Sequence, residues 1–208
     1  MRRIEYENWP RRELFEFFSA LSQPFYSVTF RVDVTRLYDY VKPRGLSFYY
    51  ALVWLCTRAI NSVEAFRVAI EGGEPVLLDK RAPSFTDMKP GAESFHIVTM
   101  PAEMGTLEEF CRAAAAKSRS QQSFIDPAAE SGELIYFSCL PWVDITALTN
   151  ERDFDKDDSI PRVAWGRYVE ENGRKTLGLS LEVSHRLIDG LHIGRFAQEL
   201  ERLISELN

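Results

Sequence analysis

Two residues near the C-terminus, His185 and Asp189, have the types and spacing that could do chemistry. A pattern of alternating apolar residues leads into His185, and Asp189 follows four residues later, directly before Gly190 and a helical pattern. A histidine at the end of a strand can act as a base, because its ordinary pKa of about 6.5 leaves it largely neutral at pH 7. A positioned base of this kind makes a hydroxyl group a better nucleophile by accepting its proton.

Both residues also have ordinary structural interpretations. A single histidine in a strand is often a core or edge residue, and an aspartate before Gly-Leu is often only the N-cap of a helix. A six-residue pattern has a high false-positive rate, so the elements around it must help to decide.

The remaining sequence predicts the elements that position these residues. We expect helices at residues 10–21, 35–41, 47–61, 106–120 and 193–207. We expect strands at residues 28–34, 66–70, 75–78, 94–100, 134–140, 162–169 and 175–185. Strands and helices mix without strict alternation, which indicates an α/β fold with a mixed β-sheet and helices packed on it. The acidic stretch at residues 153–158 is more typical of a solvated loop than of a metal site.

The last two strands predict a hairpin that turns at Asn172-Gly173. In the second strand the apolar residues from Leu177 to Val183 alternate, and His185 has the same parity. We therefore expect the imidazole to point toward the packed side of the sheet, where burial favours its neutral form.

Composition excludes several classes of protein. The 208 residues predict one domain, residues 1–208, and 45% hydrophobic with 27% charged residues is ordinary globular composition. The net charge of −6 argues against a nucleic-acid partner. No segment approaches the ~20 apolar residues of a membrane span, and no apolar run follows the N-terminal arginines, so we expect a cytoplasmic protein without a membrane partner. The three histidines form no ligand pattern with cysteines or carboxylates, so we expect no metal site.

Five segments together resemble the chloramphenicol acetyltransferase family of the CoA-dependent acyltransferase superfamily. They are Asn8–Glu13, Phe66-Arg67, Leu140–Val143, Gly166–Tyr168 and Ser184–Gly194. They run nearly from end to end of the chain, and their order agrees with the family.

The resemblance implies a chloramphenicol acetyltransferase-like two-layer sandwich that assembles as a homotrimer, with active sites at the subunit interfaces. It implies acetyl-CoA as co-substrate, no bound cofactor, and chloramphenicol or a similar small hydroxyl compound as acceptor, hence a role in antibiotic resistance. His185 would take the proton from the acceptor hydroxyl, which attacks the thioester directly, so that no acyl-enzyme forms.

The resemblance also implies roles for other residues. Asp189 would pair with Arg11 and so support the turn that holds the histidine, and Arg167 and Tyr168 would bind coenzyme A. Plausible wall residues for the acceptor pocket are Phe25, Tyr26, Phe30, Phe95, Phe137 and Ile145, each of which is also a credible core residue.

Two positions depart from the family pattern. Counted from the Pro-Trp-Val segment, Ala147 occupies the place of a serine that assists the oxyanion, and Ala164 replaces a threonine that orients a water there. Loss of one such donor costs ~10²–10³ in rate in other acyl-transfer enzymes. The alternative is therefore a weakly catalytic or non-catalytic homologue that binds a small ligand at the trimer interface. A lipoyl-type acyltransferase core is a third possibility, because Ser184–Gly190 is also similar to the active-site segment of that family; the matching length and the missing lipoyl domain argue against it.

Overall fold

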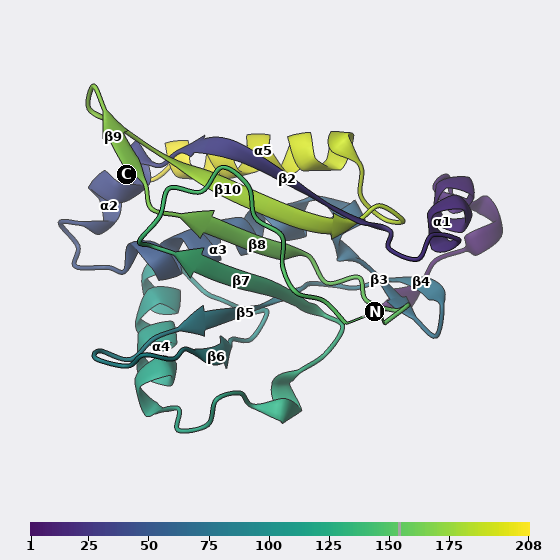
Figure 1. Cartoon of the computed structure of the whole chain (residues 1–208), viewed down its shortest axis with the longest axis horizontal. Coiled ribbons are helices and arrows are strands. Elements are labelled where there is room, and N and C mark those ends of the chain that lie inside the picture. The colour runs from purple at the N-terminus through teal and green to yellow at the C-terminus, as the bar shows by residue number, and fades with distance from the viewer. Residues whose placement is uncertain (154) are drawn as a thin grey trace.

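The computed structural model describes residues 1–153 and 155–208, and its main feature is a mixed sheet in the strand order β2-β10-β8-β7-β5-β6 (Figure 1). The strands of this sheet are β2 (Phe25–Asp33), β5 (Ala82–Asp87), β6 (His96–Thr99), β7 (Leu134–Leu140), β8 (Arg162–Gly166) and β10 (Arg174–Ser184), with the short β9 (Val169–Glu171) beside β10. Strands β5, β7 and β8 run parallel, and the other neighbours are antiparallel. A smaller sheet contains β1 (Arg2–Arg3), β4 (Glu74–Leu77) and β3 (Val68–Glu71).

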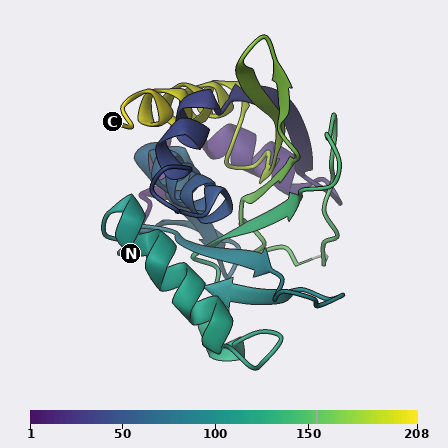
Figure 2. The ribbon, with the colours of Figure 1, turned by 90° about the vertical axis from the view of Figure 1, so that its left-hand side faces the viewer.

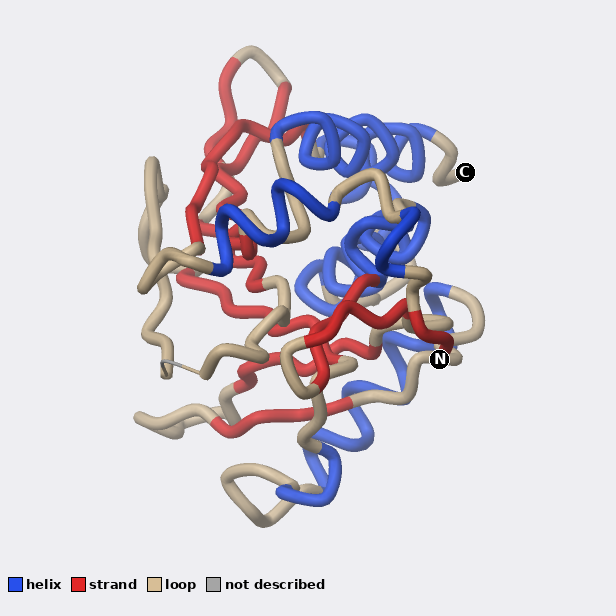
Figure 3. Tube along the Cα trace, turned by 90° about the vertical axis from the view of Figure 1, so that its right-hand side faces the viewer, coloured by secondary structure: helices blue, strands red, loops and turns tan. Residues whose placement is uncertain are grey.

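Helices cover one face of the large sheet, as the two side views show (Figures 2 and 3). The helices are α1 (Arg12–Ser19), α2 (Thr35–Val41), α3 (Phe48–Ser62), α4 (Leu107–Ser120) and α5 (Gly190–Ser205), with short 3₁₀ turns at Tyr6–Asn8, Glu64–Arg67 and Pro127–Ala129. Helix α3 packs on the sheet between helices α4 and α5, whereas α1 stands beyond the end of β10 (Figure 1). The long connection from β7 to β8 crosses the opposite face of the sheet (Figure 3). The prediction of a mixed sheet with packed helices is confirmed.

The core forms between the sheet and α3. Leu177, Leu179, Leu181 and Val183 of β10 are fully buried at this layer. Helix α3 is buried around most of its circumference, because Ala51 to Thr57 are all buried. A helix that is packed on several sides needs apolar residues around its circumference rather than on one stripe.

The predicted strand at residues 162–169 is two strands in the structure. Strand β8 ends at Gly166, where a Cβ atom would lie 2.5 Å from the carbonyl oxygen of Val143, and at Gly178 of β10 a Cβ would lie 2.2 Å from that of Ile145. These two glycines let the segment from Val143 to Ile145 lie directly on the sheet, and the Arg167 amide donates to Val143 (2.7 Å). The predicted turn at Asn172-Gly173 joins β9 to β10, with φ of 52° and 79°.

Strand β5 was missed by the sequence analysis, although it lies inside the sheet between β7 and β6. Its sequence contains Pro83, which cannot donate a backbone hydrogen bond and argues against an inner strand. In the structure the Pro83 carbonyl still accepts from the Met100 amide (2.9 Å).

The prediction of a solvated acidic loop at residues 153–158 was wrong for part of that stretch; Phe154 lies outside the described residues. The Asp157 carboxylate accepts from the amides of Gly72 (2.7 Å) and Gly73 (2.9 Å). Asp158 has a side chain only 9% exposed and pairs with Arg152 and Arg162. These carboxylates therefore attach the β7–β8 connection to the rest of the fold.

Candidate active site

His185 directly follows β10, at the end of the sheet where α1 is found. Strand β10 stops at Ser184, one residue earlier than predicted, but the His185 amide continues the pairing by donating to the Pro24 carbonyl (2.6 Å). The imidazole stacks on Phe18 of α1, with 4.0 Å between ring centroids, and contacts Tyr26 of β2 at 4.5 Å. The backbone of β10 and two aromatic rings thus fix the orientation of the ring.

The environment of His185 keeps the imidazole neutral. Burial lowers its pKa, the positive charge of Arg11 lowers it further, and the negative charge of Asp189 opposes both. Neither ring nitrogen has a hydrogen-bond partner among residues 1–153 and 155–208. The half-buried ring therefore has a nitrogen free to accept a proton from a ligand.

Arg11 connects α1 to the turn after His185. Its guanidinium donates to the Asp189 carboxylate (2.7 Å) and to the carbonyls of His185 (3.0 Å) and Arg186 (2.9 Å). The Arg11 side chain is 12% exposed and that of Asp189 is 35% exposed. The structure thus brings together the two residues that the resemblance paired, across almost the whole sequence.

Asp189 is at the same time the N-cap of α5. Its other carboxylate oxygen accepts from the Leu191 amide (3.1 Å), while its own amide donates to Nδ1 of His192 (3.2 Å). Burial raises the pKa of Asp189, but the hydrogen bond from Arg11 and the nearby positive charges outweigh it and lower the pKa. The structural and the functional interpretation of this residue are therefore compatible.

A buried ionic network lies on the β10 side of the turn, and sequence reasoning missed it. Glu182 accepts from Arg152 (2.6 Å), from Ser27 (3.0 Å) and from the Asn150 amide (2.9 Å). Arg186 donates to the Ser184 hydroxyl (3.0 Å) and to the carbonyl of Asp158 (2.8 Å). The network could not be found from the sequence, because its members are separated by up to 155 residues.

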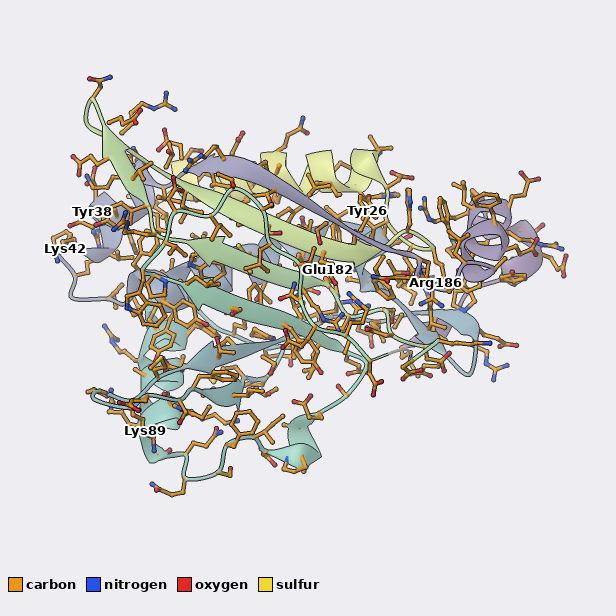
Figure 4. The ribbon with its side chains drawn as sticks, in the orientation of Figure 1. Tyr26, Tyr38, Lys42, Lys89, Glu182 and Arg186 are labelled. Carbon is orange, nitrogen blue, oxygen red and sulfur yellow. The ribbon has the colours of Figure 1, made fainter. Side chains whose placement is uncertain are left out.

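Arg167 and Tyr168 lie at the opposite end of the sheet. Arg167 is exposed, and the Tyr168 ring packs on Tyr38 of α2 at 5.5 Å. The Lys175 ammonium lies 4.6 Å from the Tyr38 ring. Figure 4 shows this separation: Tyr38 and Lys42 lie at one end of the molecule, and Tyr26 and Arg186 toward the other.

A cleft of about 810 Å³ opens at the carboxyl ends of β5 and β7. Aromatic side chains line it, among them Tyr49, Tyr50, Phe85, Phe95, Phe124, Phe137 and Trp142. His185 is not among the lining residues. Ser138, which lines the cleft, is level with Ser180 of β10 in the sheet, and Arg162, also in the lining, is level with Glu182. His185 follows three residues after Glu182, or about 10 Å along the strand at ~3.4 Å per residue. His185 of one chain therefore lies outside the lining of that chain's own cleft.

The structure distributes the six predicted wall residues over several places. Phe95 and Phe137 line the cleft, and Tyr26 contacts His185 instead. Phe30 packs edge-on against Phe196 of α5 at 6.3 Å, in the core layer. These four residues therefore lie in three different environments: the cleft, the contact with His185 and the core layer.

The other two predicted wall residues have structural neighbours. The Arg152 guanidinium lies over the Phe25 ring at 3.3 Å, and buried Ile145 rests on Gly166 and Gly178. The structure does not bring either residue to the cleft.

Ala147 is exposed in the β7–β8 connection and does not line the cleft. Serine and threonine residues that do line it are Ser47, Ser84, Thr86 and Ser138. No residue of the described chain makes a hydrogen bond with the Ser138 hydroxyl, which belongs to β7. Ala164, which is 1% exposed, is the direct neighbour of Ser138 on β8. The alternation of Ile135 and Phe137 with Tyr136 and Ser138 along β7 was the available signal that Ser138 faces away from the core.

No group of three or more metal-binding side chains occurs in the part of the chain that the structure describes. Within the same residues no helix has the length and apolar character needed to span a membrane.

Comparison with known proteins points to one family. The family model for chloramphenicol acetyltransferase matches residues 1–201. A chloramphenicol acetyltransferase of Streptomyces acrimycini is 28% identical over 98% of this chain and 94% of its own length. Chloramphenicol acetyltransferase 3 of Escherichia coli is 27% identical over 97% and 95%, respectively.

Solved structures agree at the level of the fold. A chloramphenicol acetyltransferase structure superposes with a TM-score of 0.86 at 24% identity and covers 98% of this chain and 100% of that chain. A probable dihydrolipoamide acetyltransferase of Listeria monocytogenes superposes less well, with a TM-score of 0.66 at 14% identity over 96% and 93% of the two chains.

Proposed function

The chain belongs to the chloramphenicol acetyltransferase family, and from this premise we propose that it transfers an acetyl group from acetyl-CoA to a hydroxyl of chloramphenicol or a similar small acceptor. Relatives that cover nearly the whole chain carry this activity in their names. We further propose that residues 1–208 act as a single domain.

The observation that carries the proposal is the held, neutral imidazole of His185. Phe18 and Tyr26 fix its ring, Arg11 fixes its backbone, and burial lowers its pKa. The imidazole accepts the acceptor's hydroxyl proton while the hydroxyl oxygen bonds to the thioester carbonyl carbon. The C–S bond then breaks, and the imidazolium returns the proton to the leaving thiolate of coenzyme A. Atoms and charges balance without a covalent acyl-enzyme, and the base contributes ~10²–10⁴-fold.

The positions of the base and the cleft support an active site shared between copies of the chain. Within one chain His185 does not line the cleft, and it follows three residues after Glu182, the β10 residue that is level with the lining residue Arg162. We propose that His185 of one subunit faces the acceptor cleft of a neighbour in a homotrimer. Exposed apolar residues of α1 and of the segment directly after it, beside Phe18, offer a contact surface for this; they are Leu14, Phe17 and Leu21.

We also propose that Arg167 and Tyr168 belong to the coenzyme A side. An exposed arginine beside two tyrosine rings and the Lys175 ammonium suits an adenine ring and phosphate groups. In the assembled site the end of one subunit that carries Arg167 and Tyr168 would lie next to His185 of another subunit.

Oxyanion support is assigned to Ser138 rather than to Ala147. The Ser138 hydroxyl lines the cleft, and donors aimed at a developing oxyanion stabilise the transition state. The alternative of a non-catalytic homologue rested on missing hydroxyls at Ala147 and Ala164. With a hydroxyl available at Ser138, only the replacement at Ala164 still favours it, so we prefer the catalytic interpretation.

The test is release of coenzyme A thiol when the protein is mixed with acetyl-CoA and chloramphenicol. We expect turnover by the native chain, and a fall in kcat of at least ~10³ in His185→Ala with its circular dichroism and its mass in solution unchanged. Light scattering should give about three chain masses. Turnover that survives in His185→Ala would remove the base from the mechanism, and a stable monomer with full activity would exclude the shared site.

A further inference from the structure

The aromatic cleft carries an excess of negative charge. Three carboxylate side chains line it, those of Asp87, Glu130 and Glu151, and Arg162 supplies the one cationic side chain among the lining residues that the structure describes. Arg162 is already paired with the buried Asp158 (3.0 Å) and donates to the Ile160 carbonyl (3.2 Å). The charge of Arg162 is therefore balanced by Asp158 within the fold and does not compensate the carboxylates that line the cleft.

Tyrosine hydroxyls bind two of these carboxylates without neutralising them. Tyr50 donates to Asp87 (2.5 Å), and Tyr136 donates to Glu130 (2.8 Å). Burial raises the pKa of both phenols, and the hydrogen bonds to the carboxylates raise it further. Each phenol therefore stays a neutral donor, and each carboxylate accepts its hydrogen bond at the wall of an aromatic cavity.

One carboxylate oxygen of Glu130 has no hydrogen-bond partner in the described chain. Its Oε2 accepts from Tyr136, while its Oε1 is buried and has no hydrogen-bond partner in the described chain. A buried charged acceptor without a donor is costly in a folded protein, because the desolvation of the group is not compensated. A ligand that brings a charged donor to this wall would remove that cost.

We propose that the acceptor cleft selects hydroxyl compounds that also carry a protonated amine, held by Glu130 with support from Asp87. The inference rests on the proposed function only in taking this cleft as the acceptor site. Two kinds of group in the cleft wall attract a cation. The carboxylates pair with it, and the aromatic rings of Tyr49, Phe137 and Trp142 offer cation–π contacts. A neutral acceptor would fill the aromatic volume but leave the carboxylates unpaired.

The test compares two acceptors of the same shape at pH 7. Both have the arylpropanediol skeleton of chloramphenicol. One carries a dimethylamino group in place of the amide. This tertiary amine is protonated at pH 7, and its free base has no N–H, so it cannot be converted into a stable amide by acetylation. The other carries the neutral, isosteric isopropyl group. We expect kcat/KM, followed by coenzyme A thiol release, to favour the amine about tenfold or more.

Three single variants test whether Glu130 causes the preference for the amine. Glu130→Gln keeps the shape and an acceptor for Tyr136 but removes the charge, so we expect the ratio of the two kcat/KM values to fall about tenfold. Asp87→Asn should lower it less, because both oxygens of Asp87 already accept hydrogen bonds. Glu133→Gln is the matched control: this exposed carboxylate is three residues away, does not line the cleft, and should leave the ratio as in the native protein.

Binding measured by calorimetry separates this inference from the proposed function. If neither these two compounds nor chloramphenicol is acetylated, the proposed function fails, and the relative affinities of the two compounds for the native protein and Glu130→Gln decide the inference alone. Equal affinity and equal kcat/KM for amine and isostere would overturn it, as would a preference for the amine that survives in Glu130→Gln.

Discussion

Arg11 is the residue whose loss best tests how the site is held together. It makes three hydrogen bonds to a turn almost the full length of the chain away, and two of them reach the carbonyls of His185 and Arg186. Arg11→Ala leaves both carbonyls and the Asp189 carboxylate without this donor. The turn should then loosen around the imidazole while the sheet remains intact.

The size of the effect follows from these contacts. Each hydrogen bond to a carbonyl contributes about 1 kcal/mol, and one to a charged group contributes about 1.5–3 kcal/mol. Asp189 is 35% exposed, so water replaces part of the lost interaction and the lower value applies. We therefore expect Arg11→Ala to lower the free energy of unfolding by about 3.5 kcal/mol. Asp189→Ala should cost a similar amount, because it also removes the N-cap of α5.

The pH dependence adds a readout that general destabilisation would not move. The charge of Arg11 lowers the pKa of His185, whereas the charge of Asp189 raises it. The acid limb of kcat/KM, which follows the free base, should therefore move to higher pH in Arg11→Ala and to lower pH in Asp189→Asn.

Urea unfolding and pH–rate profiles of both single variants and the double variant provide the assay. The two effects on unfolding free energy should be non-additive by about 2 kcal/mol. The neighbouring Arg12→Ala is the matched control, because Arg12 pairs with Glu7 and Glu16 and lies over the Tyr6 ring at the surface, away from the turn, and should change neither quantity appreciably. Additive losses, or acid limbs that move in the same direction in Arg11→Ala and Asp189→Asn, would refute the reasoning.

Three further outcomes are expected. Because the pKa of His185 is lowered, the acid limb of kcat/KM for the native protein should lie below the ordinary ~6.5, and a limb above that value would contradict a neutral, desolvated base. Ser138→Ala should lower kcat ~10²-fold while Ala147→Ser leaves it unchanged, in the thiol-release assay; the reverse pattern would return the oxyanion role to Ala147. Glu182→Gln, which leaves the buried Arg152 and Arg162 to share Asp158 as their carboxylate partner, should lower the urea-unfolding free energy by about 3 kcal/mol, and an unchanged midpoint would show that the network is not stabilising.

Local patterns were enough to predict most elements. Alternation in β7 and β10, the Thr106 capping box before α4 and the Asn172-Gly173 turn all act over a few residues, so the chain alone reveals them. The missed strand β5 has no such pattern: Pro83 opposes it, and only its two neighbouring strands make it an inner strand.

The candidate site divides in the same way. His185 and Asp189 were identifiable from the sequence because strand end, turn and helix start lie within six residues, which is enough to place a base and cap a helix. Arg11, the partner of Asp189, is 178 positions away, and the sequence indicated this pairing only through the family resemblance.

Tertiary structure alone decided which hydroxyl and which charges face the cleft. Counting along the chain placed Ala147 at the oxyanion, but the glycines at positions 166 and 178 hold the preceding residues against the sheet, and Ala147 stays outside the cleft. Ser138 and Asp87 meet there because parallel pairing puts β5 and β7 side by side, and Glu130, which precedes β7, joins them through its hydrogen bond with Tyr136. Strand pairing between distant segments depends on packing and register across the whole sheet, which no short window of sequence contains.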